Sequence, residues 1–271
     1  MTRGIHICAD DYALSPGVSS AIRTLAAAGR ISATSVMTVF AGLPEEAALL
    51  GSAVGERRVS IGLHVTLTGR FAPLVATPVD GVQFPSLGRL MAAAFGGGLR
   101  LGDVAAEVEA QFQAFRAAFG RGPDHVDGHQ HAHLLPGIRS IVLDATARHA
   151  PGVLVRDCTQ SPGARIGFDA KGRLISLLAR GLAREARARG LQVNTGFAGA
   201  YDLRQGGDFP ALFARFVSGL GEGGLVMVHP GHVDEVLAGR DPVLAPREAE
   251  FGFLSGPELE PVLRAANVHL L

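Results

Sequence analysis

Two adjacent carboxylates are the first residues in this chain whose types and spacing could do chemistry. Asp10 and Asp11 directly follow residues 4–9 (GIHICA), an apolar run typical of a strand buried on both faces. Neighbouring side chains at a strand end point in different directions, so the two carboxylates could do separate work. One could bind a metal ion while the other accepts a proton from a water whose pKa the metal has lowered. Helix capping or solvation in a loop is the alternative for either residue alone.

A run of alternating histidines is the second feature. His129, His131 and His133 occur at every second position of residues 127–133 (DGHQHAH), so they would share one face of an extended segment. A histidine-rich tract is typical of metal sites, and imidazole suits transition metals. One ligand from this strand end is sufficient, so we expect the other two histidines to contact substrate or to support the ligand. An exposed polar loop is the alternative.

Three more polar groups fall at predicted strand ends. His64 lies late in the segment VSIGLHVTLT, Arg156 follows VLV, and His229 follows GLVMV. In a barrel of parallel strands the carboxyl ends all face one way, and active sites are built there. We therefore expect these side chains to meet Asp10, Asp11 and His129 at one rim, with His229 as a candidate general acid.

The segments that position these groups alternate between strand and helix patterns. Strands are predicted at 4–9, 35–40, 59–68, close to Asp127, 152–155, 191–195, 224–228 and 268–271. Helices are predicted at 18–28, 101–120, from about 136, 173–189, 209–220 and 258–266, with Asp103 capping the second and Gly120 closing it. This order predicts one α/β domain over residues 1–271, a TIM-like (β/α) barrel. The turn-rich stretches 71–85 and 239–250 are predicted substrate loops.

Composition excludes several classes of protein. Lys+Arg and Asp+Glu both number 25, so no basic excess favours nucleic acid as a partner. No segment approaches the roughly 18 uninterrupted apolar residues of a membrane span. Cys8 and Cys158 are the only cysteines and form no disulfide framework. Because the N-terminus also lacks the pattern of a signal peptide, we expect a cytoplasmic protein.

The ligand types alone leave more than one function open. Two imidazoles and one carboxylate occur both in hydrolytic zinc enzymes and in non-haem iron oxygenases. The alternation of strands with helices favours the hydrolase, since such oxygenases typically have antiparallel double-sheet folds. A non-catalytic sugar-binding module is the third hypothesis, and a hydrolase of another amide or ester is the fourth.

Read together, four blocks of sequence resemble the YdjC-like carbohydrate deacetylases, a family that includes chitooligosaccharide and hopanoid-biosynthesis deacetylases. The blocks are ADDYALSPGV (9–18), GLHVTLTG (62–69), HVDGHQHAHLLP (125–136) and MVHPG (227–231). The segment REAEFGFLSGPEL (247–259) is also similar to the closing segment of the family. The resemblance implies a distorted (β/α) barrel, related to the NodB-type deacetylases, that removes acetyl groups from N-acetylated amino sugars.

Roles for individual residues follow from the same resemblance. Asp11, His64 and His129 match metal ligands, which implies one divalent ion, Zn or Mg. Asp10 matches the catalytic base, Arg156 a residue that orients it, and His229 the acid. The residues expected at the substrate are Tyr12, His131, His133, Phe197, His232 and Arg247.

The chain also departs from the family pattern. Tyr12-Ala13 stands where the family usually has Phe-Gly, and the chain has no Trp and only two Tyr. Sugar sites commonly stack pyranose rings on flat aromatic side chains, so we expect a short amino sugar or a glycolipid rather than a long chitin-type chain. A homodimer is compatible with the sequence, which carries no pattern that distinguishes a subunit interface from a helix core.

Overall fold

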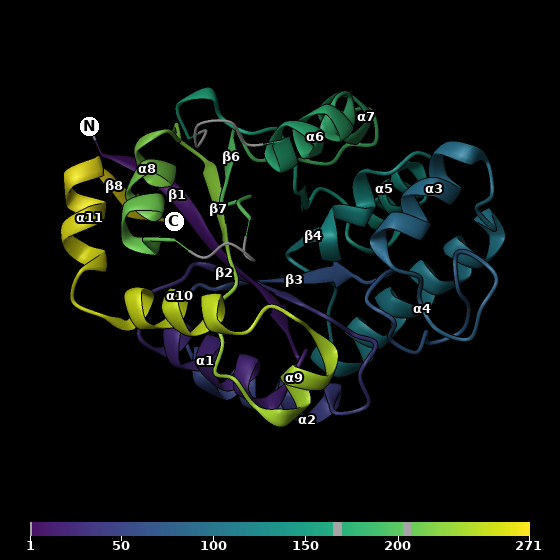
Figure 1. The fold of residues 1–271 in the computed structure, drawn as a ribbon, viewed down its shortest axis with the longest axis horizontal. Coiled ribbons are helices and arrows are strands. Elements are labelled where there is room, and N and C mark those ends of the chain that lie inside the picture. Colours follow the sequence, from purple (N-terminus) through teal and green to yellow (C-terminus); the bar gives the residue numbers. More distant parts are fainter. Residues whose placement is uncertain (1, 165–169, 203–206) are drawn as a thin grey trace.

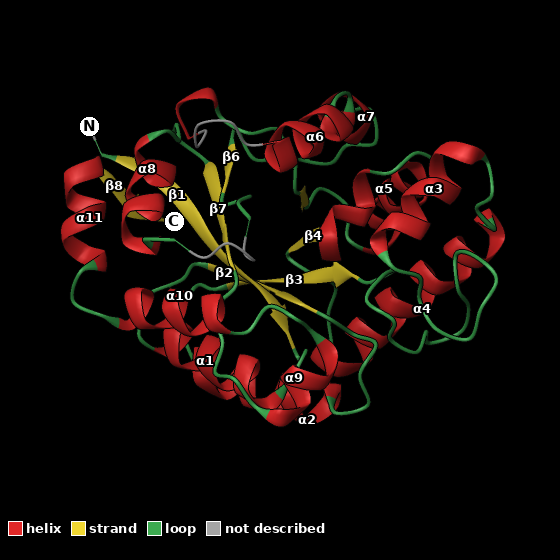
Figure 2. Cartoon of the chain, viewed as in Figure 1, coloured by secondary structure: helices red, strands yellow, loops and turns green. Residues whose placement is uncertain are grey.

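Parallel strands form the centre of the molecule, and helices lie around them (Figures 1 and 2). The structure is a computed structural model, and it describes residues 2–164, 170–202 and 207–271. The strands are β1 (Arg3–Tyr12), β2 (Ala33–Val36), β3 (Ser60–Val65), β4 (His125–Gly128), β5 (Leu154–Val155), β6 (Phe197–Ala198), β7 (Gly224–Val228) and β8 (Val268–Leu270). Their pairings are parallel, as the alternation of strands and helices predicts.

The sheet curls into a distorted barrel. Its strand order is β5-β4-β3-β2-β1-β7-β6, and β8 pairs with the start of β1. Two isolated parallel bridges, Leu154 with Gln192 and Gln160 with Phe197, join the segment around β5 to the segment around β6. The two ends of the strand order therefore meet. The predicted TIM-like (β/α) barrel is confirmed, although β5 and β6 are only two residues long each.

The helices cover the outside of the sheet. They are α1 (Pro16–Ala27), α2 (Leu43–Val54), α3 (Leu87–Gly96), α4 (Leu101–Phe119), α5 (Ile138–His149), α6 (Ala170–Ala179), α7 (Leu182–Arg187), α8 (Phe209–Ser218), α9 (Glu235–Arg240), α10 (Ala245–Ser255) and α11 (Leu259–Ala266). Short 3₁₀ turns, η1 (His129–Leu134) and η2 (Pro162–Ala164), lie between them.

The spacing of apolar residues explains why α4 is a helix with one buried face. Val104, Val108, Phe112 and Phe115 recur at three- or four-residue steps and are buried, which is the pattern of one helix face packed on a core. Gly120 ends the helix in a left-handed conformation, as predicted.

The prediction that Asp103 is the N-cap of α4 is wrong, because the helix begins about one turn earlier. Arg100 occupies the N-cap position, and Asp103 lies in the first helical turn. A carboxylate there is favourable beside the helix N-terminus, and it also pairs with Arg100 at 2.6 Å.

Other predicted elements also differ from the structure, and three of them differ in kind or position. The strand expected at 35–40 is β2, which begins at Ala33 and ends at Val36. The helix expected at 173–189 is divided into α6 and α7 by Gly181, whose φ of 87° is incompatible with a continuous helix. No strand covers 191–195, where Gln192 alone forms a bridge.

The two predicted substrate loops have different outcomes. Residues 71–85 contain no helix or strand, as predicted. Residues 239–250 instead contain the end of α9 and the first half of α10. The prolines misled the sequence interpretation here, because Pro246 lies in the first turn of α10, where proline needs no backbone N–H.

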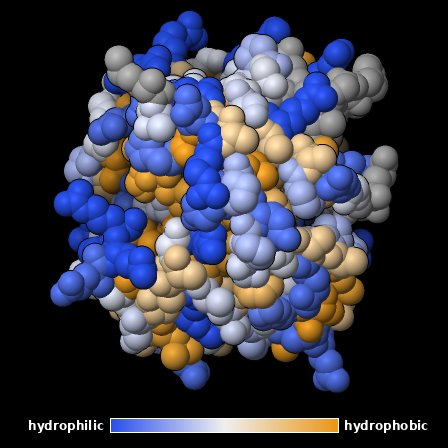
Figure 3. Space-filling model, turned by 90° about the vertical axis from the view of Figure 1, so that its left-hand side faces the viewer, coloured by the Kyte–Doolittle hydropathy of each residue, from blue (hydrophilic) through white to orange (hydrophobic). Residues whose placement is uncertain are grey.

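The core lies between the sheet and the helices, and the outer surface is mixed. Helix α11 is an example, because it buries Leu259 and Leu263 and exposes Glu260 and Arg264. Hydrophilic and hydrophobic side chains alternate over the face that carries this part of the chain (Figure 3). Within the described residues, no helix has both the length and the apolar character that a bilayer crossing requires.

Candidate functional site

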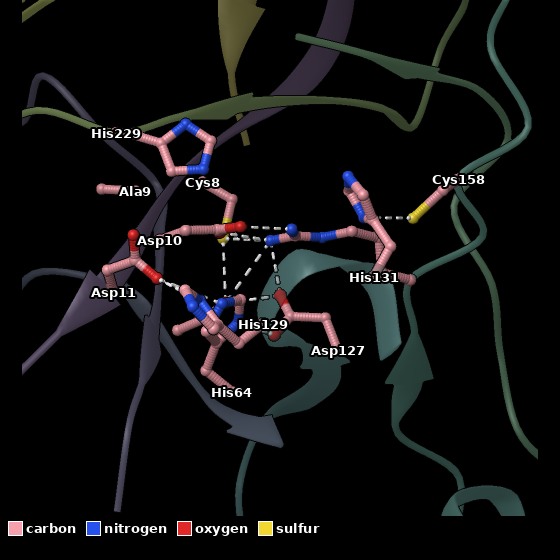
Figure 4. A network of polar contacts seen from close by, with 12 residues as sticks. Cys8, Ala9, Asp10, Asp11, His64, Asp127, His129, His131, Cys158 and His229 are labelled. Atoms are coloured by element: carbon pink, nitrogen blue, oxygen red, sulfur yellow. Dashed lines mark hydrogen bonds and ion pairs between the residues drawn. The ribbon is translucent and has the colours of Figure 1, made fainter. Parts of the chain in front are cut away.

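The end of β1 is irregular, and the side chains of the adjacent Asp10 and Asp11 point in different directions. The register between β1 and β2 shifts between Ala9 and Tyr12, and Asp11 has a φ of 68°. A positive φ is uncommon outside glycine, although Asp adopts it more readily than most residues, and such conformations recur at functional sites. Asp10 contacts Arg156, whereas Asp11 points toward His64 and His129, as Figure 4 shows for Asp11.

Asp11, His64 and His129 form a compact buried cluster. Asp11 Oδ1 lies 3.3 Å from His64 Nε2 and 3.0 Å from His129 Nδ1. One ligand atom from each residue lies within 4.8 Å of those of the other two. Asp11 and His64 lie near the ends of β1 and β3, and His129 is the first residue of η1, directly after β4. The structure therefore brings the three predicted metal ligands together. One carboxylate and two imidazoles are a donor set that suits a divalent transition metal.

A second layer of charged groups holds this cluster. Asp127 Oδ1 accepts a hydrogen bond from His64 Nδ1 at 2.6 Å, and Arg247 Nη2 donates to Asp11 Oδ2 at 2.7 Å. Burial raises the pKa of Asp11, but Arg247 and His129 outweigh burial and hold the pKa well below its ordinary value. Burial lowers the pKa of His64, but the carboxylates of Asp127 and Asp10 raise it to about 10.

The charge of this region matches a divalent cation. Its linked ion pairs contain four carboxylates, those of Asp10, Asp11, Asp127 and Asp241, and two guanidinium groups, those of Arg156 and Arg247. When the histidines are neutral, the form in which they bind a metal, the formal charge is −2. Unbalanced buried charge is costly, so a bound divalent ion would relieve it. Both the donor set and the charge therefore fit a metal site.

Asp10 forms a bidentate ion pair with Arg156. Both carboxylate oxygens lie 2.6 Å from guanidinium nitrogens, and the two side chains are almost fully buried. Burial lowers the pKa of Arg156, but Asp10 and Asp127 raise it well above its ordinary value, so the guanidinium stays charged. The residues that the family resemblance implies as the base and its orienting partner are therefore in direct, bidentate contact.

His229 lies on the adjacent strand at the level of Asp10. Val228 pairs with Ala9, so the next residue on each strand leaves the sheet at the same height (Figure 4). The backbone N–H of His229 donates to Glu250 Oε2, and the other oxygen of Glu250 accepts from Tyr201 at 2.6 Å. Burial raises the pKa of Glu250 to about 7. Helix α10 thus anchors the residue predicted as the acid.

Comparison with protein families gives a clear match. The model of the family described as "YdjC-like protein" matches residues 4–265, which is nearly the whole chain. The chain belongs to the YdjC-like family. The resemblance inferred from the four sequence blocks is therefore confirmed.

Named relatives of this YdjC-like chain are chitooligosaccharide deacetylases. The enzyme of Serratia marcescens is 33% identical over 187 residues, which cover 65% of this chain and 72% of the relative. The enzyme of Yersinia pestis is 35% identical over 144 residues, so the match spans about half of either protein, 52% and 55%.

A solved structure supports the fold of the YdjC-like chain. An Enterococcus faecalis protein named for cellobiose-phosphate cleavage aligns over 100% of this chain and 97% of its own, with a TM-score of 0.72 and 20% identity. At that identity the likeness concerns the fold alone.

Three residues predicted to contact substrate, His131, His133 and Phe197, lie together beside the buried cluster. The ring of His131 is 5.9 Å from that of Phe197, and its Nδ1 is 3.4 Å from Cys158 Sγ. His133 Nε2 donates to the backbone oxygen of Arg156 at 3.0 Å. Phe197 is fully buried. The extended segment predicted for the alternating histidines is wrong, because residues 129–134 form the turn η1, in which Gln130 and His131 have positive φ values.

Two other predicted substrate residues lie elsewhere. Tyr12 is fully buried, and its hydroxyl contacts Arg23 on α1 and Glu46 on α2. Burial raises its pKa above the ordinary value. The ring of His232 lies 4.3 Å from that of Phe251 at a more exposed position. Arg247, the sixth residue of this set, pairs with Asp11 and with Asp241 and is almost fully buried.

Two site residues, Asp127 and Glu250, were not predicted from the sequence. Asp127 opens the histidine run and is the second-last residue of β4, so its position near a strand end could have marked it. Glu250 lies one helical turn after Arg247 on α10, a spacing that puts both side chains on one helix face. The interpretation of 239–250 as a loop hid that relationship.

Proposed function

We propose that this protein is a metal-dependent carbohydrate N-deacetylase. The observation that carries the proposal is the buried cluster of Asp11, His64 and His129 beside the bidentate pair of Asp10 and Arg156. This arrangement places three cation ligands next to an oriented carboxylate that could act as a base. Family membership and the names of the relatives support the same reaction class.

In the proposed reaction, water attacks the carbonyl carbon of an acetamide group. Asp10 accepts a proton from that water, and the charged Arg156 holds the carboxylate in position. His229 donates a proton to the departing nitrogen as the C–N bond breaks. The products are acetate and the free amine. Arg247 keeps Asp11 turned toward the two histidines during the cycle.

A divalent ion held by Asp11, His64 and His129 would supply Lewis acidity to the carbonyl oxygen and lower the pKa of water. The two imidazole nitrogens favour zinc, cobalt or nickel over magnesium in affinity. Zinc is therefore our first candidate, and magnesium is the second.

We propose a short N-acetylated amino sugar or an amino-sugar glycolipid as substrate. The chain has no Trp and only two Tyr, and both tyrosines are buried with their hydroxyls bonded to glutamates. An extended row of stacked pyranose rings therefore has few flat side chains to lie on. Phe71 lies beside the cluster, with its ring centre 6.1 Å from that of His129, but it is buried as well.

Acetate release tests this proposal directly. The protein is stripped with a chelator, reloaded with zinc, cobalt, nickel or magnesium, and given N-acetylglucosamine, its short oligomers and an N-acetylglucosaminyl lipid. We expect acetate only after metal is restored, and far less of it from the Asp10→Asn variant. Release from simple acetyl esters but from no amino sugar would favour the alternative, a hydrolase of another ester or amide.

A further inference from the structure

Asp127 connects the two halves of the site, although the proposed reaction gives it no step. The carboxylate is fully buried at the end of β4. Its Oδ1 is 2.6 Å from His64 Nδ1, and its Oδ2 is 2.5 Å from both Arg156 Nη2 and Ser35 Oγ. In Figure 4, Asp127 lies beside His64, and Asp10 lies above them.

The geometry assigns the two nitrogens of His64 to different tasks. A carboxylate that is paired with a buried guanidinium is a hydrogen-bond acceptor, so the group facing it on His64 must be N–H. Nδ1 therefore carries a proton, and Nε2 is the nitrogen directed at Asp11 Oδ1, 3.3 Å away. Metal-binding histidines commonly donate their second N–H to a carboxylate in this way.

Charge balance argues against Asp127 serving only as a counterion for Arg156. Asp10 already contacts both terminal nitrogens of that guanidinium, which carries a single positive charge. Asp127 thus brings a second negative charge to Arg156, and this charge lies against His64. Placing it there is favourable when a cation binds on the far side of the same imidazole.

We propose that Asp127 is a positioning residue for metal binding. It holds the Nδ1 proton of His64 and thereby presents Nε2 as the ligand atom in the cluster with Asp11 and His129. The inference rests on the proposed metal site, and it is independent of which substrate the enzyme hydrolyses.

Zinc affinity and histidine NMR test this assignment on the chain of residues 1–271. The zinc dissociation constant is measured by chelator competition for the wild type and for Asp127→Ala, Asp127→Asn and Ser35→Ala. We expect Asp127→Ala to weaken zinc binding by about 10- to 100-fold. Asp127→Asn keeps the shape and a neutral acceptor, so we expect a smaller loss. Ser35→Ala removes another contact of Asp127 but leaves the contact to His64, so we expect nearly wild-type affinity.

Nitrogen-15 spectra of the zinc-loaded, histidine-labelled protein report which ring nitrogen carries the proton. A merely structural role of Asp127 would not change that signal. We expect one imidazole with an Nδ1–H protected from exchange, assigned to His64 by its loss in His64→Gln. That proton should exchange faster in Asp127→Asn, a variant that preserves side-chain volume if the alanine variant does not fold.

The outcomes separate this inference from the proposed function. Unchanged zinc affinity and an unchanged Nδ1–H in folded Asp127 variants would overturn the inference. Equal losses of affinity in Ser35→Ala and Asp127→Ala would also overturn it, because they would indicate a general packing effect. Zinc binding that depends on Asp127, in a protein that deacetylates no amino sugar, would refute the proposed activity and support the role of Asp127.

Discussion

Arg247 Nη2 donates to Asp11 Oδ2 at 2.7 Å and so ties the end of β1 to α10, 236 positions later in the chain. The other oxygen of Asp11 is left to face His64 and His129. The same Nη2 contacts Asp241 at 2.6 Å, and the guanidinium is almost fully buried. Arg247 was predicted from the sequence to contact substrate. In the structure it forms an ion pair that orients a candidate metal ligand.

Loss of the Arg247 guanidinium should lower the free energy of unfolding. Arg247→Met keeps much of the side-chain volume but leaves Asp11 without its buried partner, so we expect unfolding free energy to fall by roughly 3–5 kcal/mol. Urea denaturation of metal-free protein measures the loss. Arg264→Met, at an exposed position of α11, is the matched control and should change stability little. A variant as stable as the wild type would contradict the importance of the pair.

Asp10 and Asp11 should have separable functions. Asp10→Asn removes the proposed base but none of the three clustered ligands, so turnover should fall by about 10²- to 10⁴-fold with zinc still bound. Asp11→Asn should lose zinc and turnover together. Acetate release and zinc content, measured on the same preparations, check the difference. Loss of zinc from Asp10→Asn would show that the two residues act as one unit.

Acid should destabilise the protein through His125. This residue is buried, and its ring nitrogens lie 3.0 Å from Ser35 Oγ and 2.8 Å from Ser60 Oγ. Burial lowers its pKa to about 4 from an ordinary value of 6.5. Between those pH values the unfolded chain binds a proton that the folded chain excludes, so stability is full above pH 6.5 and falls as the pH drops toward 4.

The size of this effect is measurable. We expect His125 to contribute a loss of about 2 kcal/mol in unfolding free energy between pH 7 and pH 5. His125→Gln has no titrating ring, so the difference between the two pH values should shrink by that amount. Denaturant titrations at both pH values provide the measurement. An unaltered pH dependence would place the acid sensitivity in other groups, of which His133 is one, because burial lowers its pKa to about 4.

Glu107 should control the loop that borders His129. This fully buried carboxylate on α4 accepts hydrogen bonds from the backbone N–H groups of Leu74, Val75 and Ala76. Glu107→Ala should lower stability by about 2 kcal/mol, since it leaves those donors without their acceptor. We also expect KM to rise more than kcat falls.

A neighbouring residue provides the control for this loop prediction. Glu109 on the same helix makes ion pairs with Arg148 and His149 at the surface, and such pairs contribute at most about 1 kcal/mol. Glu109→Ala should therefore leave KM unchanged. Equal effects of the two substitutions on KM would argue against a specific role for the loop.

The sequence by itself determined the fold class and the strand ends that carry the polar groups. Alternating apolar runs and helical patterns predict a parallel barrel, because each pattern reports which faces of a segment are buried. Once the strands are parallel, Asp11, His64 and His129 must leave the sheet at the same edge. That is why residues 53 and 65 positions apart could be assigned to one cluster from the sequence alone.

The contacts between individual polar groups of the site depend on the tertiary structure. The turn at Asp11 depends on a register shift between β1 and β2, and it directs the Tyr12 hydroxyl to Glu46. Such a shift is set by pairing between strands, which local sequence patterns do not encode. The partners of Asp127 and the ion pair of Arg247 depend likewise on how distant elements pack. Local patterns report which side of an element is buried, and the packing of distant segments selects the atom that each buried charge meets.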